Sequence, residues 1–86
     1  MRIVIGEDSA LFREGLVLLL RDAGHEVAAA VGDALALVDA VEREAPDLAI
    51  VDIRMPPGNE DDGARAAAKI RRDRPGVAVM LLSQHV

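Results

Sequence analysis

Four short apolar runs, separated by segments of similar length, constrain the fold of this 86-residue chain more than any other feature. They occupy residues 2–5, 27–31, 48–51 and 77–82, and each is almost entirely apolar instead of alternating with polar residues. Strands that are buried on both faces of a parallel sheet have this pattern, whereas strands with one face in water alternate. The intervening segments are long enough for crossover helices, so the sequence predicts the order βαβαβαβ.

Helical periodicity and turn residues mark the segments between these runs. The first helix is expected over about residues 10–23, because Ser9 can cap its start and Gly24 its end. A second helix is expected to follow Asp33 and cannot continue through Pro46. A third is expected over residues 63–74, where basic residues at the far end suit the helix dipole. The predicted fold is an α/β domain with a doubly wound parallel sheet and the strand order 2-1-3-4.

The composition excludes several classes of function. Because the chain has no cysteine, it has no disulfides, thiolate metal sites or cysteine nucleophile. Phe12 is the only aromatic residue, so base stacking is not expected, and the formal net charge of −5 opposes binding to a phosphate backbone. No apolar run approaches the ~20 residues that cross a bilayer. We therefore expect a soluble, cytoplasmic domain that makes no membrane contact.

Acidic residues follow two of the predicted strands at the point where ligands bind in such folds. Open parallel sheets bind ligands beyond the carboxyl ends of their strands, where the strand order reverses. The first and third strands meet at that point. Glu7 and Asp8 follow the first strand, and Asp52 follows the third. Three converging carboxylates repel unless a cation neutralises them, and oxygen ligands favour Mg²⁺ or Mn²⁺ over zinc. The alternative is that Asp8 and Asp52 merely cap the segments that follow them.

Other motifs give weaker indications. The glycine after Gly6 is Gly15, so the dinucleotide-binding pattern is absent, and no phosphate-cradling G-x-x-x-x-G-K sequence occurs. His25 and His85 are expected to be ordinary surface histidines. The acidic cluster at residues 60–62 is most simply the favourable N-terminal charge of the third helix.

The acids and their neighbours resemble the receiver domain of two-component response regulators. The resemblance rests on Glu7-Asp8 after the first strand, on Asp52 followed by Ile-Arg-Met-Pro, and on Ser83 after the fourth strand. Residues 12–16 (Phe-Arg-Glu-Gly-Leu), residues 82–86 (Leu-Ser-Gln-His-Val), the Pro-Pro loop and Asp62-Gly63 look more specifically like actinobacterial regulators. In that subgroup the receiver precedes a LuxR-type helix-turn-helix domain. The implied architecture is the flavodoxin-like receiver fold.

The resemblance implies a role for each matching residue. Asp52 would be the phospho-acceptor, taking a phosphoryl group from a sensor histidine kinase. Mg²⁺ would be bound by Asp8, Asp52 and the backbone carbonyl of Arg54, with Glu7 acting through a metal-bound water. The Ser83 hydroxyl would contact the phosphoryl group and sense it. The domain would then be a signalling switch for a transcriptional output domain and not an enzyme.

The end of the chain departs from the family pattern. Receiver domains continue with a fifth strand and helix and a lysine that pairs with the phosphoryl group, and Lys69, the only lysine here, falls on the predicted third helix. We therefore expect residues 1–86 to be a receiver domain truncated before its fifth βα unit, without an output domain and so without DNA contacts of its own. The run from Val77 to Leu82 is expected to form an exposed sheet edge that favours self-association as a dimer.

Two further interpretations stay open. The first is a receiver-like module for protein interaction or dimerisation that is not phosphorylated. The second is a Mg²⁺-dependent hydrolase with Asp52 as its nucleophile. Haloacid-dehalogenase-like enzymes carry a second aspartate two residues after the nucleophile, where this chain has Arg54, which argues against that class.

Overall fold

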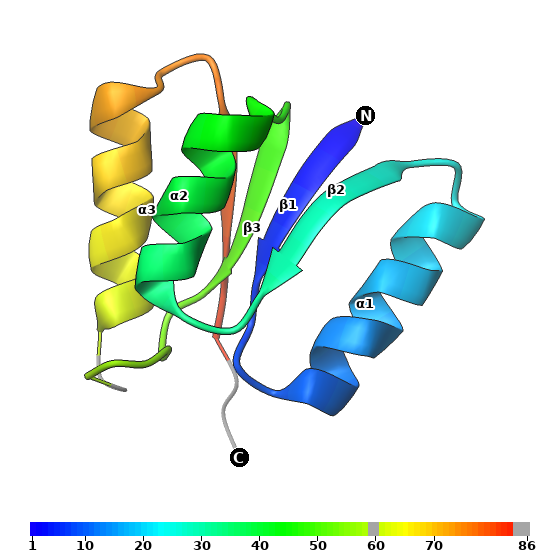
Figure 1. The fold of residues 1–86 in the computed structure, drawn as a ribbon, viewed down its shortest axis with the longest axis horizontal. Helices are drawn as coiled ribbons and strands as arrows, with labels where there is room; N and C mark the ends of the chain where they lie inside the picture. Colours follow the sequence, from blue (N-terminus) through cyan, green and yellow to red (C-terminus); the bar gives the residue numbers. More distant parts are fainter. Residues whose placement is uncertain (59–60, 84–86) are drawn as a thin grey trace.

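The computed structural model describes residues 1–58 and 61–83, in which strands and helices alternate along the chain (Figure 1). The elements are β1 (Arg2–Gly6), α1 (Ala10–Asp22), β2 (Glu26–Val31), α2 (Ala34–Glu44), β3 (Leu48–Asp52), α3 (Asp62–Asp73) and β4 (Ala78–Leu82). All seven predicted elements are present. Glu60 and residues 84–86, including His85, lie outside the described residues.

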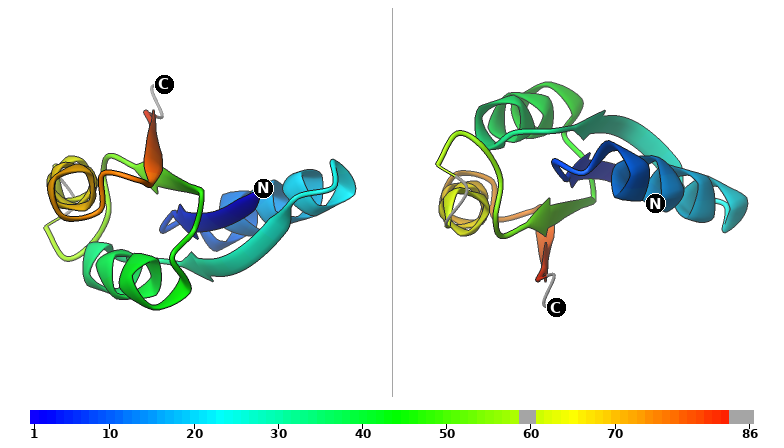
Figure 2. Two further views of the ribbon diagram at one scale, coloured as in Figure 1. Left: turned by 90° about the horizontal axis from the view of Figure 1, so that it is seen from above. Right: turned by 90° about the horizontal axis from the view of Figure 1, so that it is seen from below.

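The four strands form one parallel sheet in the predicted order β2-β1-β3-β4. Helices α2 and α3 lie on one face of this sheet and α1 lies on the other, against the β2 side (Figure 2). Gly6 pairs with Val51 in β3, and Asp52 pairs with Leu82 in β4. The carboxyl ends of β1, β3 and β4 are therefore level at one edge of the sheet.

The sheet separates two apolar clusters of unequal burial. On the side of α2 and α3, Val4, Leu37 and Met55 are fully buried within the larger cluster. On the opposite side, Ile3, Ile5 and Ile50 pack against partly buried residues of α1. Helix α1 itself has no fully buried residue. Its exposed large apolar residues are Leu11, Phe12, Leu18 and Leu19.

Local signals in the sequence fix the helix ends. The Asp33 carboxylate caps α2 by accepting the Ala36 N–H at 2.7 Å. After α2, Ala45 adopts the left-handed conformation with φ 45°, because the following Pro46 disfavours a right-handed helical residue before it. After α1, Gly24 takes a positive φ of 93°, which glycine adopts without steric cost.

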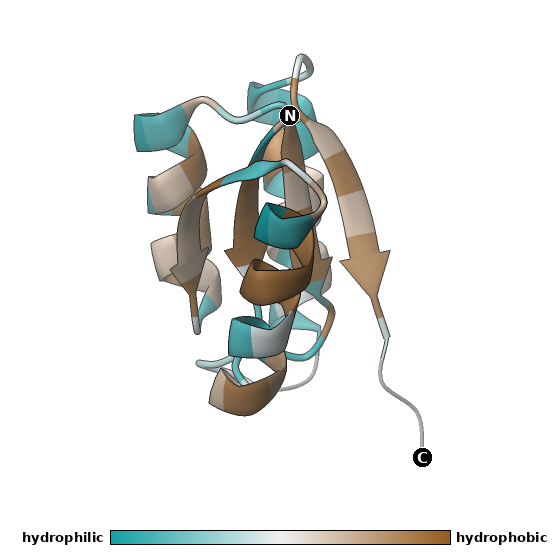
Figure 3. Cartoon of the chain, turned by 90° about the vertical axis from the view of Figure 1, so that its right-hand side faces the viewer, coloured by the Kyte–Doolittle hydropathy of each residue, from teal (hydrophilic) through white to brown (hydrophobic). Residues whose placement is uncertain are grey.

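Strand β4 forms an edge of the sheet and is the most exposed strand. It pairs only with β3 among the described residues, and Met80 and Leu81 are 49% and 39% exposed. Figure 3 shows this apolar strand at one side of the molecule. The predicted exposed edge is therefore present, while self-association through it stays a prediction.

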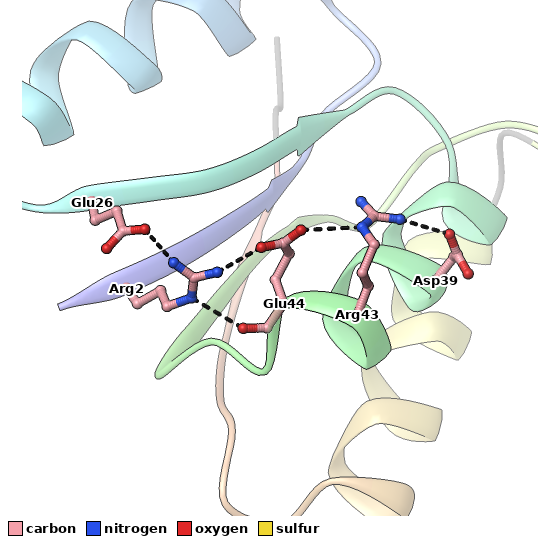
Figure 4. A network of polar contacts seen from close by, with 5 residues as sticks. All are labelled: Arg2, Glu26, Asp39, Arg43 and Glu44. Atoms are coloured by element: carbon pink, nitrogen blue, oxygen red, sulfur yellow. Dashed lines mark hydrogen bonds and ion pairs between the residues drawn. The ribbon is translucent and has the colours of Figure 1, made fainter.

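A network of ion pairs ties the elements together at the edge opposite the carboxyl ends of the strands (Figure 4). Arg2 pairs with Glu26 of β2 and Glu44 of α2, and its Nε donates to the Glu44 carbonyl at 3.0 Å. Arg43 continues the network by pairing with Asp39 and Glu44. Exposed pairs of this kind contribute at most about 1 kcal/mol each, so the network adds little to the stability of the fold. None of the described helices has the length and apolar character that a membrane span requires.

Candidate functional site

Three acidic side chains converge at the carboxyl ends of β1 and β3. Glu7 and Asp8 directly follow β1, and Asp52 is the last residue of β3. Each offers a carboxylate oxygen, and these oxygens all lie within 4.8 Å of one another. We call these three residues the acidic pocket. Within residues 1–58 and 61–83, no other group of three potential metal ligands lies this close together.

The three acids differ sharply in burial. The side chains of Glu7 and Asp52 lie almost entirely out of solvent, with 0% and 5% exposed, whereas Asp8 is exposed. Isolated buried charges are strongly disfavoured, so nearby donors must stabilise the two inner carboxylates. The Ser9 N–H donates to Glu7 Oε2 at 3.0 Å, and the Arg54 N–H donates to Asp52 Oδ1 at 3.2 Å.

Burial raises the pKa values of both inner acids, and repulsion by a neighbouring acid adds to the rise in each. The pKa of Glu7 rises from 4.5 to about 7, first because burial disfavours the charged form and then because Asp52 lies beside it. Burial also raises the pKa of Asp52, while hydrogen bonds from the Arg54 N–H and from Glu7 oppose the rise. The charged form of each inner carboxylate is therefore disfavoured in this buried environment.

The loop after Asp52 is held by close packing against the start of α3. The Gly63 N–H donates to the Ile53 carbonyl at 2.8 Å. A Cβ built at Gly63 would lie 1.7 Å from the Asp52 carbonyl oxygen, so no other residue fits without moving the backbone. Glycine at this position therefore allows α3 to abut the end of β3 and to fix the backbone that carries Asp52.

The structure also places Arg54, Ser83 and Lys69, which the sequence analysis considered. Arg54 is exposed two residues beyond Asp52, and its contact with the pocket is the backbone N–H already described. Ser83 is exposed directly after β4, next to Leu82, which pairs with Asp52. Lys69 lies on α3, as predicted, and its Nζ pairs with Asp73 at 2.8 Å.

Two residues at the site were given no role there from the sequence, although both lie in stretches that resemble the receiver family. One is Gly63, and the other is Arg13 of α1, whose Nη1 donates to the Glu7 carbonyl at 2.6 Å. In the sequence, Arg13 is indistinguishable from a solvated residue on a helix surface. His25, which was expected to be an ordinary surface residue, contacts the N-terminal amine through Nδ1 at 3.1 Å.

The donor set of the acidic pocket fits a hard divalent cation. All its side-chain donors are carboxylate oxygens, which Mg²⁺ prefers, and it contains no imidazole or thiolate that would favour zinc. Burial raises the pKa values of Glu7 and Asp52, and the neighbouring acids raise them further by repulsion. A cation bound to these oxygens would relieve that repulsion.

The parallel sheet with strand order 2-1-3-4 and the acids at the point where that order reverses are features that can be compared with known protein families. Residues 3–86 match the model of the response regulator receiver domain. The chain therefore belongs to the response regulator receiver domain family. It spans 38% of the length of two curated relatives from Mycobacterium tuberculosis. These are the transcriptional regulatory protein PdtaR, 39% identical over 93% of this chain, and the probable transcriptional regulatory protein NarL, 37% identical over 99%.

Solved structures agree with this assignment. The signal receiver domain of NarL from Mycobacterium tuberculosis superposes with a TM-score of 0.87 and 37% identity, covering 99% of this chain and 67% of that one. A LuxR-family two-component response regulator from Aurantimonas superposes with a TM-score of 0.83 and 26% identity, covering 99% of this chain and 59% of that one. The predicted receiver fold is thus confirmed.

Proposed function

We propose that the chain accepts a phosphoryl group on Asp52 and acts as the receiver of a two-component response regulator. The observation that supports this most strongly is the meeting of Glu7, Asp8 and Asp52 at neighbouring strand ends. Asp52 accepts the Arg54 N–H at 3.2 Å, a contact that favours its carboxylate form as a nucleophile. Its oxygen attacks the phosphorus of the donor and forms an acyl phosphate, while the bond from phosphorus to the leaving group breaks.

Mg²⁺ is the cofactor that this proposal assigns to the acidic pocket. Asp8, Asp52 and the Arg54 backbone carbonyl would hold it directly, and Glu7 would act through a bound water. The cation would neutralise charge on the attacking carboxylate and the transferring phosphoryl oxygens. Asp8 is suited to meet an incoming cation because it is the exposed member of the pocket, whereas the other two acids are buried.

Ser83 would connect phosphorylation to a change in conformation. It follows β4 at the same edge of the sheet as Asp52, because Leu82 is the residue that pairs with Asp52. Its exposed hydroxyl could then donate to a phosphoryl oxygen on Asp52 and draw the segment after β4 toward the pocket. A local charge change that biases one segment between two positions is a common form of molecular switch.

The partners follow from the same proposal. A sensor histidine kinase would supply the phosphoryl group, and a helix-turn-helix output domain outside this chain would contact DNA. The exposed apolar residues Leu11 and Phe12 lie within one helical turn of Ser9, which contacts Glu7 of the acidic pocket. They offer a surface on which the histidine kinase could dock. In this role the chain receives a phosphoryl group and passes on a signal, without turning over a substrate of its own.

Phosphorylation with a small phosphodonor tests the proposal directly. The purified chain would be incubated with acetyl phosphate and Mg²⁺, and its intact mass would be recorded. We expect a gain of one phosphoryl group that hydroxylamine removes, that chelation of Mg²⁺ prevents, and that Asp52→Asn abolishes. Asp22→Asn is the matched control, since Asp22 is an exposed acid at the far end of α1. Phosphorylation that persists in Asp52→Asn would contradict the assignment.

A second candidate function is a receiver-like interaction module that is not phosphorylated. The observation that favours it is the exposed apolar edge strand β4, with Met80 and Leu81 49% and 39% exposed. This alternative predicts that the chain self-associates through β4 and that Mg²⁺ and acetyl phosphate leave the association unchanged. A change in the monomer–dimer equilibrium upon phosphorylation would exclude it.

A further inference from the structure

Arg13 reaches from the first turn of α1 to the backbone of the acidic pocket. Its Nη1 donates to the Glu7 carbonyl oxygen at 2.6 Å, and the side chain is partly buried along this path. A hydrogen bond from a charged donor is shorter and stronger than a neutral one. Arg13 thus joins α1 to the end of β1 at the position from which two of the three acids project.

This contact fixes the peptide unit between Glu7 and Asp8. The carbonyl of Glu7 and the N–H of Asp8 belong to the same rigid plane, so holding the oxygen restricts rotation of the whole unit. Glu7 has further ties, because its N–H donates to the Val31 carbonyl at 2.9 Å and its carboxylate accepts the Ser9 N–H at 3.0 Å. Asp8 is exposed, so the direction of its side chain depends strongly on the peptide that precedes it.

Gly32, in the turn between β2 and α2, leaves the space that the Arg13 guanidinium occupies. A Cβ built at Gly32 would lie 3.1 Å from Arg13 Nη1 and 3.9 Å from the Glu7 carbonyl oxygen. Any larger residue there would push the guanidinium away by a few tenths of an ångström. The end of β1, the first turn of α1 and the turn after β2 therefore meet around this one side chain.

We propose that Arg13 is a positioning residue that aims the Asp8 carboxylate at the cation of the acidic pocket. The proposal rests on the proposed function, since it assigns a role in the same metal site. It predicts a change in Mg²⁺ affinity, upon removal of Arg13, that is opposite to the change expected from charge alone. A positive charge near the pocket repels a divalent cation, so removing it would tighten Mg²⁺ binding if charge were all that mattered. If Arg13 positions Asp8, removing it weakens binding.

Calorimetric titration of the purified chain with Mg²⁺ separates these two effects. We expect Arg13→Met to weaken Mg²⁺ binding about tenfold, the effect typical of losing a residue that orients a metal ligand. Arg13→Lys keeps the charge and one donor, so it should weaken binding less. The matched control is Arg21→Met, which removes the same charge from an exposed position on the same helix and should leave the affinity unchanged.

A measurement without metal tests the positioning role independently of the proposed function. In the absence of Mg²⁺, the NMR resonances of the Glu7 carbonyl carbon and the Asp8 amide should shift in Arg13→Met and stay in place in Arg21→Met. Gly32→Ala should move the same resonances in the same direction. Its effect should not add to that of Arg13→Met, because both changes act on one contact.

The outcomes are distinguishable. A wild-type chain that fails to bind Mg²⁺ contradicts the proposed function, while the metal-free shifts still decide whether Arg13 holds the Glu7–Asp8 peptide. Unchanged or tighter Mg²⁺ binding in a folded Arg13→Met variant overturns the inference. Glu7 and Asp8 resonances that stay in place in that variant overturn it as well. Should Arg13→Met fail to fold, the same two readouts in Arg13→Lys and Gly32→Ala decide the question.

Discussion

Replacing Glu7 by glutamine removes a buried ionisable group while keeping its shape. The Glu7 side chain is 0% exposed, and its carboxylate accepts the Ser9 N–H, a contact that an amide oxygen can retain. Burial, followed by the nearby charge of Asp52, raises the pKa of Glu7 from 4.5 to about 7. The ionised form is therefore less favourable in the folded chain than in the unfolded chain.

The sign of the pH dependence follows from this difference. Below pH 4.5 Glu7 is protonated in both states and contributes no penalty to folding. Between pH 4.5 and about 7 the unfolded chain releases its proton first, so the free energy of unfolding falls as the pH rises. Each pH unit across this interval corresponds to about 1.4 kcal/mol, which gives a loss of about 3 kcal/mol above pH 7. Glu7→Gln should escape this loss.

Urea unfolding followed by far-UV circular dichroism measures the effect across pH in the absence of divalent cations. We expect Glu7→Gln and the wild type to be equally stable near pH 4, and the variant to be more stable by about 3 kcal/mol near pH 8. Glu14→Gln is the matched control, since Glu14 is exposed on α1, and its profile should follow that of the wild type. Parallel profiles for Glu7→Gln and the wild type would refute the assignment of a buried Glu7 with a raised pKa.

Four other substitutions test the packing, a helix cap and the exposed edge. Gly63→Ala should destabilise the fold by several kcal/mol in urea unfolding, because its Cβ would lie 1.7 Å from a backbone oxygen. Gly15→Ala in α1 should instead stabilise the fold by about 0.5–1 kcal/mol in the same assay, because its Cβ would meet nothing within 4 Å. Asp33→Ala should cost about 1 kcal/mol by the same assay, since it removes the α2 cap. Light scattering should show concentration-dependent dimers that Leu81→Lys abolishes, and a monodisperse wild-type monomer at high concentration would exclude association through β4.

The strand order could be predicted from the sequence because the apolar runs leave few alternatives. Apolar strands that alternate with helices are typical of a parallel sheet, and right-handed crossovers then restrict the strand order. The element boundaries were less certain. Val77 was expected to begin the last strand, but its N–H donates to the Arg74 carbonyl at 3.0 Å, so it belongs to the turn after α3 and β4 starts at Ala78.

The acidic pocket was predictable in part. The positions of Asp8 and Asp52 at the ends of two strands were enough to place them near each other once the strand order was known. The contacts of Arg13 and Gly63 were not predictable, because they depend on how closely α1 and α3 approach the strand ends. Neither residue type signals such an approach locally. Arginines cover many helix surfaces, and a helical glycine can also lie where a Cβ would contact nothing, as Gly15 does.

The most direct test of the central claim is a Mg²⁺ titration of the chain followed by amide NMR. The account predicts saturable shifts confined to the acidic pocket, its neighbour Arg54 and the contacting loops, and it predicts that Asp52→Asn loses them. Such a result would show that the carboxylates of β1 and β3 act together as one cation site. A well-dispersed spectrum that does not change with Mg²⁺ would contradict the claim and would favour a receiver-shaped interaction module.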